Sequence, residues 1–236
     1  MGETLLDRGN VSTHCEEGDM SLNCDVYLMH YKPLLERLVF MKSQLEKFNI
    51  NFTVISDEPE KSWFKDRIEI RIEKMKGLGG QYSEPITWPN ASLAWKHLIF
   101  LENAMKSHRP SLALEDDAIL SDNFVEATNR ILQENEWDAV FPGSGCNLRK
   151  PGMGLIRVPH PASKCKDAYL ITPKAAAKLH STMKDGIDFA IDWELNYQMK
   201  LHNFRVFWHE PPIVRQGSQD GTWTSSINGK RENLFR

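Results

Sequence analysis

The sequence predicts an α/β fold of three layers, in which helices cover both faces of a mostly parallel central sheet. Short apolar runs typical of buried strands alternate along the chain with segments whose apolar residues recur at helical spacing. The first two runs, at 24–29 and 52–56, enclose one such helical segment within about 35 residues. A strand–helix–strand unit of this length joins parallel strands, because an antiparallel pair needs only a short turn.

Apolar spacing and proline define the elements of the first half. Pro33 fits the first turn of a helix, because the backbone N–H that proline lacks has no partner there. The buried face of this helix is expected to carry Leu34, Leu38, Met41, Leu45 and Phe48. The charged and then glycine-rich stretch 63–82 is expected to be a loop. A second helix is expected to begin at Pro89-Asn90, and its apolar face carries Ala94, Leu98, Leu101 and Met105.

The second half continues the alternation. We expect strands at 111–114, 137–141, 167–171 and 204–208, a loop at 147–154, and helices at about 124–134 and 188–199. Thr172-Pro173 is expected to begin a further helix that ends near Met183. Threonine is a good N-cap, and proline fits the first helical position that follows it.

Charge and composition exclude several classes of protein. The formal net charge is only −3, and acidic and basic residues are spread along the chain, so no surface for nucleic acid is indicated. No apolar run approaches the roughly 18–20 residues that a membrane-spanning helix needs. The four cysteines form no Cys-x-x-Cys pair and are expected to be free thiols.

The length of the chain favours a single domain. Its 236 residues, 41% of them hydrophobic, are enough for one sizeable core. We expect a polar, flexible tail at 1–20 and one domain at 21–236, in which 216–236 forms a lid or a tail. The opening residues lack the basic-then-apolar order of a secretory signal, which predicts a cytoplasmic protein.

Three consecutive carboxylates, Glu115-Asp116-Asp117, directly follow the apolar run 111–114. Such crowding is costly unless a positive charge neutralises it, and ligands of open α/β sheets bind at the carboxyl ends of strands. Oxygen ligands suit Mg²⁺ or Mn²⁺, which also take phosphate oxygens from a substrate. The triplet therefore predicts a divalent ion, held by Asp117 with Glu115 or Asp116, that binds a diphosphate. The alternative is a solvent-exposed acidic turn that caps the following helix.

The stretch that contains this triplet, Leu-Ala-Leu-Glu-Asp-Asp-Ala at 112–118, resembles the Glu-Asp-Asp signature of glycosyltransferase family 25. That family includes the lipopolysaccharide-biosynthesis and collagen galactosyltransferases. Three further stretches resemble the family in the same order along the chain. They are 26–45, then 167–176 followed by Asp188 and Asp192, and finally 211–216 followed by Ser225 and Ser226. The resemblance covers roughly residues 22–228.

The resemblance implies a GT-A-like nucleotide-diphospho-sugar transferase fold, a nucleotide-sugar donor such as a UDP-sugar, a Mn²⁺ or Mg²⁺ ion, and inversion at the anomeric carbon. It also implies a glycan, glycolipid or glycoprotein as the acceptor. On the donor side, Asp117 would bind the metal. Asp116 would support the metal or contact the donor sugar, and Glu115 would orient the ribose or a metal-bound water. His209, after the last predicted strand, is the candidate that completes the metal site, and is otherwise a strand-end histidine.

An inverting transfer needs a general base that takes the proton of the acceptor hydroxyl. Asp192 is our first candidate and Asp188 the second, because both are expected on one face of the start of a helix. Their alternative roles are structural: Asp188 would cap the helix, and Asp192 would pair with a lysine.

The nucleotide is expected at the ends of the first two strands. A GT-A fold implies that Met29-His30-Tyr31 and Ser56-Asp57 contact the base and the ribose. Asn90 and Ser92, at the start of a helix, are candidates for the diphosphate. The family often has Ser-His where this chain has Lys96-His97, so Lys96 would either reach a phosphate or be a solvent-exposed lysine.

Two other functions are compatible with the same residues. A metal-dependent nucleotidyltransferase or phosphohydrolase also places carboxylates after a strand. An inactive glycan-binding module would keep the fold without the turnover.

Overall fold

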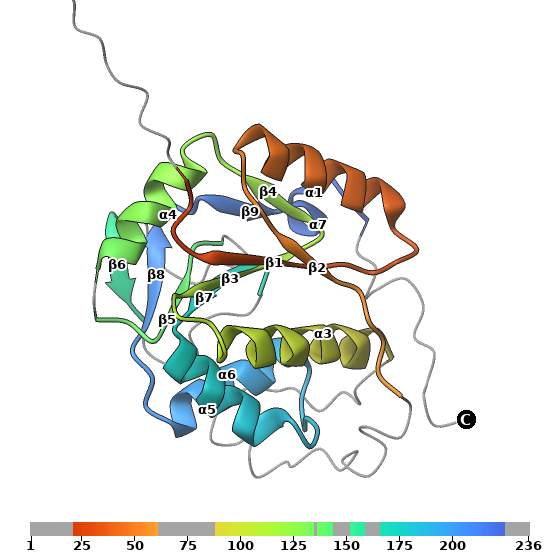
Figure 1. The fold of residues 1–236 in the computed structure, drawn as a ribbon, viewed down its shortest axis with the longest axis vertical. Coiled ribbons are helices and arrows are strands. Elements are labelled where there is room, and N and C mark those ends of the chain that lie inside the picture. Colours follow the sequence, from red (N-terminus) through yellow and green to blue (C-terminus); the bar gives the residue numbers. More distant parts are fainter. Residues whose placement is uncertain (1–20, 61–87, 135, 144–151, 159–165, 225–236) are drawn as a thin grey trace, which may run out of the picture.

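The computed structural model describes residues 21–60, 88–134, 136–143, 152–158 and 166–224. Its centre is a seven-stranded sheet with the strand order β2-β1-β3-β7-β5-β8-β6 (Figure 1). The strands are β1 (Asp25–Met29), β2 (Thr53–Ile55), β3 (Ser111–Glu115), β5 (Ala139–Phe141), β6 (Gly154–Arg157), β7 (Ala168–Ile171) and β8 (Val206–Glu210). Strands β6 and β7 run opposite to the other five, so the sheet is mixed but mostly parallel.

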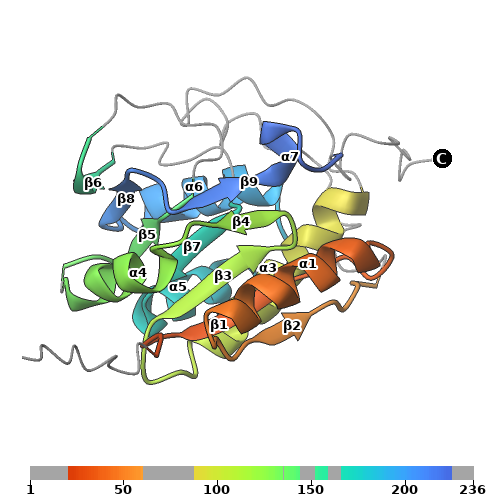
Figure 2. The same cartoon turned by 90° about the horizontal axis from the view of Figure 1, so that it is seen from above.

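Helices cover both faces of this sheet. Helices α1 (Leu35–Lys47) and α4 (Phe124–Gln133) lie on one face, and α3 (Trp88–Ala104), α5 (Pro173–Met183) and α6 (Ile191–Leu201) lie on the other (Figures 1 and 2). Each helical layer packs an apolar cluster of its own against the sheet. The predicted three-layer α/β architecture with a mostly parallel central sheet is therefore confirmed.

Strand β3 shows how the sequence produces this arrangement. Successive side chains of a strand point to opposite faces of the sheet. Leu112 and Leu114 accordingly pack in the cluster under α1 and α4, whereas Ala113 packs in the cluster under α3, α5 and α6. Because both faces are covered, the strand reads as an uninterrupted apolar run, and its first polar side chain with some exposure is Glu115 at the end.

A two-stranded antiparallel sheet lies beside the carboxyl end of β3. It pairs β4 (Ala118–Leu120) with β9 (Val214–Gln216), and the short helix α7 (Gly217–Asp220) follows β9 directly. Neither strand was expected from the sequence, since both are partly exposed and their pairing joins segments distant in the chain. The pairing brings the last described segment of the chain next to the acidic triplet.

Several boundaries differ from the prediction. Helix α6 begins at Ile191, so Asp188 precedes it and is not on its first turn. The last long strand is Val206–Glu210 rather than 204–208, because Asn203 with φ 54° ends the helix, and Phe204 N–H donates to Met199. Strand β1 begins one residue late, at Asp25. Gly154 begins strand β6, which pairs with β8, whereas a loop was expected there.

Other predictions fall outside the described residues. These are the tail at 1–20, the glycine-rich loop at 63–82, residues 147–151, and Ser225 and Ser226. The N-cap at Thr172 is confirmed, because its hydroxyl accepts the Ala175 N–H at 3.3 Å. Within the described ranges, no helix is both long and apolar enough to cross a membrane.

Candidate active site

The acidic triplet is buried at the carboxyl edge of the sheet. Glu115 is the last residue of β3, and Asp116 and Asp117 form the turn that leads into β4. Asp116 is 7% exposed and Asp117 4%, while the Glu115 side chain is 13% exposed. The alternative of a solvent-exposed acidic turn is therefore wrong, and no helix follows the triplet directly.

The carboxylate of Asp116 forms hydrogen bonds with the residues after β1 and with helix α1. Its Oδ2 accepts the Tyr31 N–H at 3.0 Å and lies 2.9 Å from His30 Nδ1, and its Oδ1 accepts Arg37 Nη1–H at 2.9 Å. Burial alone would raise the pKa of Asp116, but these three hydrogen bonds and the Arg37 charge outweigh it and lower the pKa. Arg37, rather than a metal, thus neutralises this member of the triplet.

Asp117 is held by the last described segment of the chain. Its backbone oxygen accepts Gly217 N–H at 2.8 Å, and its Oδ2 accepts Ser218 N–H at 3.3 Å. Its Oδ1 is buried and has no hydrogen-bond partner among the described residues. Burial, which the Ser218 hydrogen bonds and Arg37 offset only in part, raises the pKa of Asp117. Asp117 therefore has one acceptor oxygen to offer to a ligand.

Gly217 is required where the segment meets the triplet. A Cβ at this position would overlap the Trp223 ring and lie 3.0 Å from the Asp117 backbone oxygen. Trp223 N–H donates to Gly217 O at 2.9 Å, and the Trp223 ring packs edge-on against Phe40, with centroids 5.4 Å apart. Arg37 completes the contact, because its Nη2–H donates to the Thr224 oxygen at 2.6 Å.

Glu115 lies where several carboxylates meet. Burial is the main cause that raises its pKa well above the usual value, followed by the negative charges of Asp117, Asp192, Asp167 and Asp116. Asp167 directly precedes β7, and its backbone oxygen accepts Glu115 N–H at 3.0 Å. Carboxylates from three separate parts of the chain thus converge, and Glu115 gains a proton more readily than an exposed glutamate does.

A neutral histidine lies beneath Glu115. The His97 side chain is fully buried, its Nδ1 lies 3.0 Å from Tyr169 Oη, and its Nε2 lies 3.6 Å from Glu115 Oε1. Burial, followed by the charges of Lys166 and Lys96, lowers the pKa of His97 to about 3. The imidazole is therefore neutral near pH 7. If Tyr169 donates to Nδ1, the hydrogen on Nε2 faces Glu115.

Asp192 is the candidate base that the structure brings close to this cluster. It is the second residue of α6, and burial raises its pKa to about 6, an effect that the nearby Lys166 charge reduces. Lys166 is itself buried, with Nζ 4.4 Å from the centre of the Phe141 ring. A carboxylate with this pKa is mostly ionised at neutral pH and still readily protonated.

Asp188 occupies a different place from the predicted one. It lies in the turn before α6, because the Glu194 carboxylate accepts the backbone N–H groups of Asp188 and Phe189 at 3.0 and 3.2 Å. Its side chain is buried, but its charge is not among those that act on Glu115. The prediction that Asp188 and Asp192 share one face of a helix is wrong.

Lys96 is neither solvent-exposed nor free for a phosphate. Its ammonium group donates to Glu58 Oε1 and to Ser92 Oγ, both at 2.7 Å, and the lysine is 2% exposed. The Ser92 hydroxyl is thereby engaged with the protein itself. Asn90 lies in the first turn of α3, as expected.

The residues after the first two strands divide between core and surface. Met29 packs in the core, and His30 is turned toward Asp116, whereas the Tyr31 side chain is 43% exposed. Ser56 and Asp57 follow β2, and Asp57 is exposed. Of these five, Tyr31 and Asp57 are the ones most open to a ligand.

His209 is not brought together with the triplet. It lies inside β8 rather than after it, and its Nδ1 lies 2.8 Å from the Pro211 oxygen. Strand β8 is three positions from β3 in the sheet, which is roughly 14 Å at the usual strand spacing. The expectation that His209 follows the strand is wrong, and its position gives it no contact with Asp117.

The oxygen atoms available at the site suit a hard cation that needs few protein ligands. Within the described residues, no three His, Cys, Asp or Glu side chains form a ready-made cage. The unpartnered Oδ1 of Asp117 and the crowded carboxylate of Glu115 nevertheless offer oxygen ligands. Mg²⁺ and Mn²⁺ commonly bind through one or two carboxylates, with substrate phosphates and waters as the other ligands. The residues present fit such an ion.

Four residues of the site were given no role from the sequence alone. Arg37 lies at helical spacing from Met41 and Leu45 and shares their buried face, and a charge on an apolar face was the signal for it. Lys166-Asp167 likewise precedes a buried strand directly. The contact of Ser218 with Asp117 spans 101 residues and had no local signal.

Comparison with known proteins adds a likeness in fold. No family model matches the chain, and no curated protein matches its sequence. A similar solved structure is the crystal structure of a glycosyltransferase involved in the glycosylation of the major capsid of PBCV-1. It shares 10% sequence identity, with a TM-score of 0.44, over 82% of this chain and 92% of that chain. These values are too low for the likeness to bear on function.

Proposed function

We propose that this protein is a glycosyltransferase that moves a sugar from a UDP-sugar, with a divalent ion, to a hydroxyl of a glycan or glycoconjugate. The observation that carries the proposal is the convergence of Asp117, Asp167 and Asp192 on Glu115 at the carboxyl edge of the sheet. In open α/β sheets this edge is where ligands bind. The resemblance of 112–118 to the Glu-Asp-Asp signature of glycosyltransferase family 25 supports the sugar-transfer reaction.

The donor half of the site is assigned to the triplet and the end of β1. Asp117 and Glu115 would hold Mn²⁺ or Mg²⁺, which when bound supplies positive charge to the diphosphate leaving group. Asp116 takes no ligand role here, because both its oxygens already accept hydrogen bonds from the protein. Its role is to fix the turn against β1. Tyr31, exposed at the end of β1, is left to contact the nucleotide.

The acceptor half is assigned to Asp192. The acceptor oxygen attacks the anomeric carbon, the bond from that carbon to the diphosphate breaks, and the hydroxyl proton passes to the Asp192 carboxylate. A pKa of about 6 suits this step, because the group is ionised near pH 7 and remains basic enough to accept the proton. Lys166 helps to keep the carboxylate ionised. Attack from the face opposite the leaving group inverts the anomeric configuration.

Incubation with nucleotide sugars tests the reaction class. UDP-galactose, UDP-glucose and UDP-xylose are each supplied with Mn²⁺ or with a chelator, with and without a mixture of lipopolysaccharide-core and protein-linked acceptors. The proposal expects UDP release that depends on both acceptor and metal, and NMR of the product shows the inverted anomer. Donor cleavage at the same rate without acceptor would indicate a phosphohydrolase. Donor binding without any turnover would indicate an inactive glycan-binding module.

A further inference from the structure

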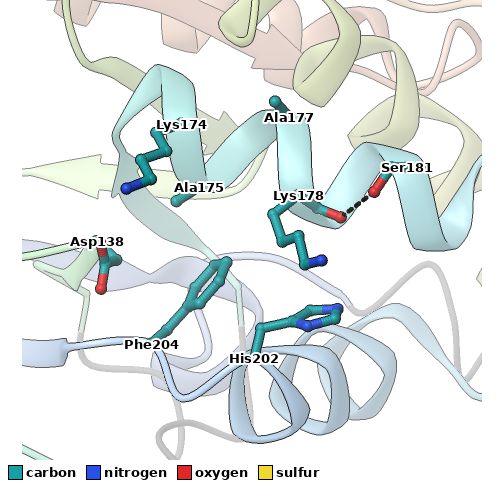
Figure 3. Close-up of a pocket in the computed structure, with 8 residues that line it drawn as sticks. All are labelled: Asp138, Lys174, Ala175, Ala177, Lys178, Ser181, His202 and Phe204. Carbon is teal, nitrogen blue, oxygen red and sulfur yellow. Dashed lines mark hydrogen bonds between the residues drawn. The ribbon is translucent and has the colours of Figure 1, made fainter.

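A cavity lies between α5 and the connection from α6 to β8 (Figure 3). Its volume is about 550 Å³, and it is lined by Asp138, Lys174, Ala175, Ala177, Lys178, Ser181, His202 and Phe204. Asp138 precedes β5, and Phe204 precedes β8. The cavity is therefore at the amino ends of these strands, the edge of the sheet opposite to the candidate active site.

One wall of the cavity is positively charged. Lys174, Lys178 and Ser181 are four and three residues apart, which places them on one face of helix α5. Figure 3 shows Lys178 extending toward His202 from the opposite wall. In the described part of the chain, neither lysine forms an ion pair. Two uncompensated ammonium groups thus border the same space.

The carboxylate that lines the cavity, Asp138, does not pair with them. Asp138 Oδ2 accepts the Arg205 backbone N–H at 2.7 Å, and Arg205 Nε lies 3.4 Å from the same oxygen. The Asp138 carboxylate is therefore already paired with Arg205. Among the described residues, no protein carboxylate pairs with Lys174 or Lys178. Both ammonium groups can therefore bind an incoming anion.

The opposite wall offers a hydrogen-bonding group and an aromatic ring. His202 caps the end of α6, and its ring lies 6.2 Å from that of Phe204, centroid to centroid. His202 Nε2 is buried and has no hydrogen-bond partner within the described residues. A buried polar atom without a partner is costly, so a ligand that bonds to it is favoured. The Phe204 ring and the two alanines form the apolar part of the cavity.

We propose that this cavity binds a phosphorylated saccharide, independently of the reaction at the acidic triplet. Lys174 and Lys178 would bind the phosphate through charge-assisted hydrogen bonds. His202 Nε2 would bond to the phosphate or to a neighbouring hydroxyl, and the apolar face of the sugar ring would pack on Phe204. A cavity of 550 Å³ is within the usual range for small-molecule sites and holds a mono- or disaccharide.

Titration calorimetry with glucose 6-phosphate, inorganic phosphate and glucose tests the proposal. We expect glucose 6-phosphate to bind at least tenfold more tightly than either of the other two. Lys178→Gln should weaken this binding at least tenfold. Lys42→Gln, which removes one exposed lysine charge on α1, should leave it within twofold, and so should Asp117→Asn at the other edge of the sheet.

Each contrary outcome overturns a stated part of the proposal. Equal affinity for phosphate and glucose 6-phosphate removes the contact with the sugar. Binding that survives Lys178→Gln but is lost in Asp117→Asn moves the ligand to the acidic triplet. Absence of binding by all three probes rejects the site. Amide NMR shifts on adding glucose 6-phosphate should be largest at 174–181 and 202–204.

Discussion

Arg37 and Asp116 form a buried ion pair, in which Arg37 Nη1–H donates to Asp116 Oδ1 at 2.9 Å and both side chains are at most 9% exposed. The pair joins helix α1 to the turn after β3. Because Arg37 also holds the Thr224 oxygen, three segments that are distant in sequence meet at one guanidinium group. Removal of one partner of a buried pair leaves the other charge without compensation.

Arg37→Ala should lower the free energy of unfolding by about 3–5 kcal/mol, as expected when a buried charge loses its partner. Urea denaturation followed by circular dichroism measures the change. Arg130→Ala is the matched control, because Arg130 pairs with Glu126 on the surface, where both side chains are more than half exposed. An exposed pair of this kind contributes about 0.5 kcal/mol or less. Equal losses in the two variants would contradict a special role for Arg37.

Asp117→Asn should abolish metal-dependent nucleotide binding while the fold is retained. The amide keeps an oxygen that can accept the Ser218 N–H, but it supplies no negative charge to a cation. Calorimetry with UDP and Mn²⁺ should show at least a tenfold loss of affinity. Asp122→Asn, which alters an exposed carboxylate paired with Lys47, should bind as the unchanged protein does. Unchanged affinity in Asp117→Asn would remove this residue from the metal site.

Asp192→Asn should lower turnover by roughly 10²–10⁴-fold, the usual contribution of a general base, and leave donor binding within twofold. In the unchanged protein, kcat/KM should rise with pH through about 6, because the base must be ionised. This acid limb should be absent from the residual activity of the variant. Asp185→Asn, in the exposed turn after α5, is the control. A loss of turnover below tenfold would indicate that Asp192 has a structural role and is not the general base.

The same Asp192 substitution should stabilise the metal-free protein at neutral pH. The folded pKa of about 6 lies above the ordinary pKa of 3.8, so Asp192 favours folding below pH 3.8, and this contribution is lost as the pH rises through 6. Asparagine resembles the protonated form at every pH. Asp192→Asn should therefore raise the free energy of unfolding by about 2 kcal/mol at pH 7.5 and change it little near pH 4. Urea denaturation in chelator at both pH values measures the difference.

His97 should stay neutral across the physiological pH range. Its pKa of about 3 is depressed by burial and by Lys166 and Lys96, so NMR should show no titration of its ring between pH 5 and 8. With a depressed folded pKa, its contribution to stability is present above pH 6.5 and is lost as the pH falls toward 3. His97→Gln should therefore make unfolding less sensitive to acid over this range. A ring that titrates near pH 6.5 would contradict the buried, neutral state.

Local patterns in the sequence predicted most of the fold. Helical spacing placed α1, α3 and α4, and the Thr172-Pro173 pair placed the start of α5. Strands buried on both faces were visible as apolar runs because each face has its own helical layer. Strands β4, β6 and β9 were missed, since they are partly exposed and their stability comes from partners distant in sequence.

The candidate site was less accessible to sequence reasoning. Position after a strand was enough to place Glu115-Asp116-Asp117 at the carboxyl edge of the sheet. The different roles of the three carboxylates were not predictable, because they depend on which carboxylate bonds to Arg37 and which bonds to Ser218. Asp188 was misplaced for a similar reason: the Glu194 side chain bonds to the backbone before α6 and holds it outside the helix.

The contact between Arg37 and Thr224 bridges 187 positions of the chain. A ribosome releases the amino-terminal part first, and contacts between distant positions wait until the later one has emerged. The bonds of Gly217 and Ser218 to Asp117 must wait as well. In a nascent chain that already contains β1, α1 and β3, Asp116 and Asp117 thus still lack the contacts that residues 217–224 provide. The carboxylates acquire their final surroundings only after residues 217–224 have emerged.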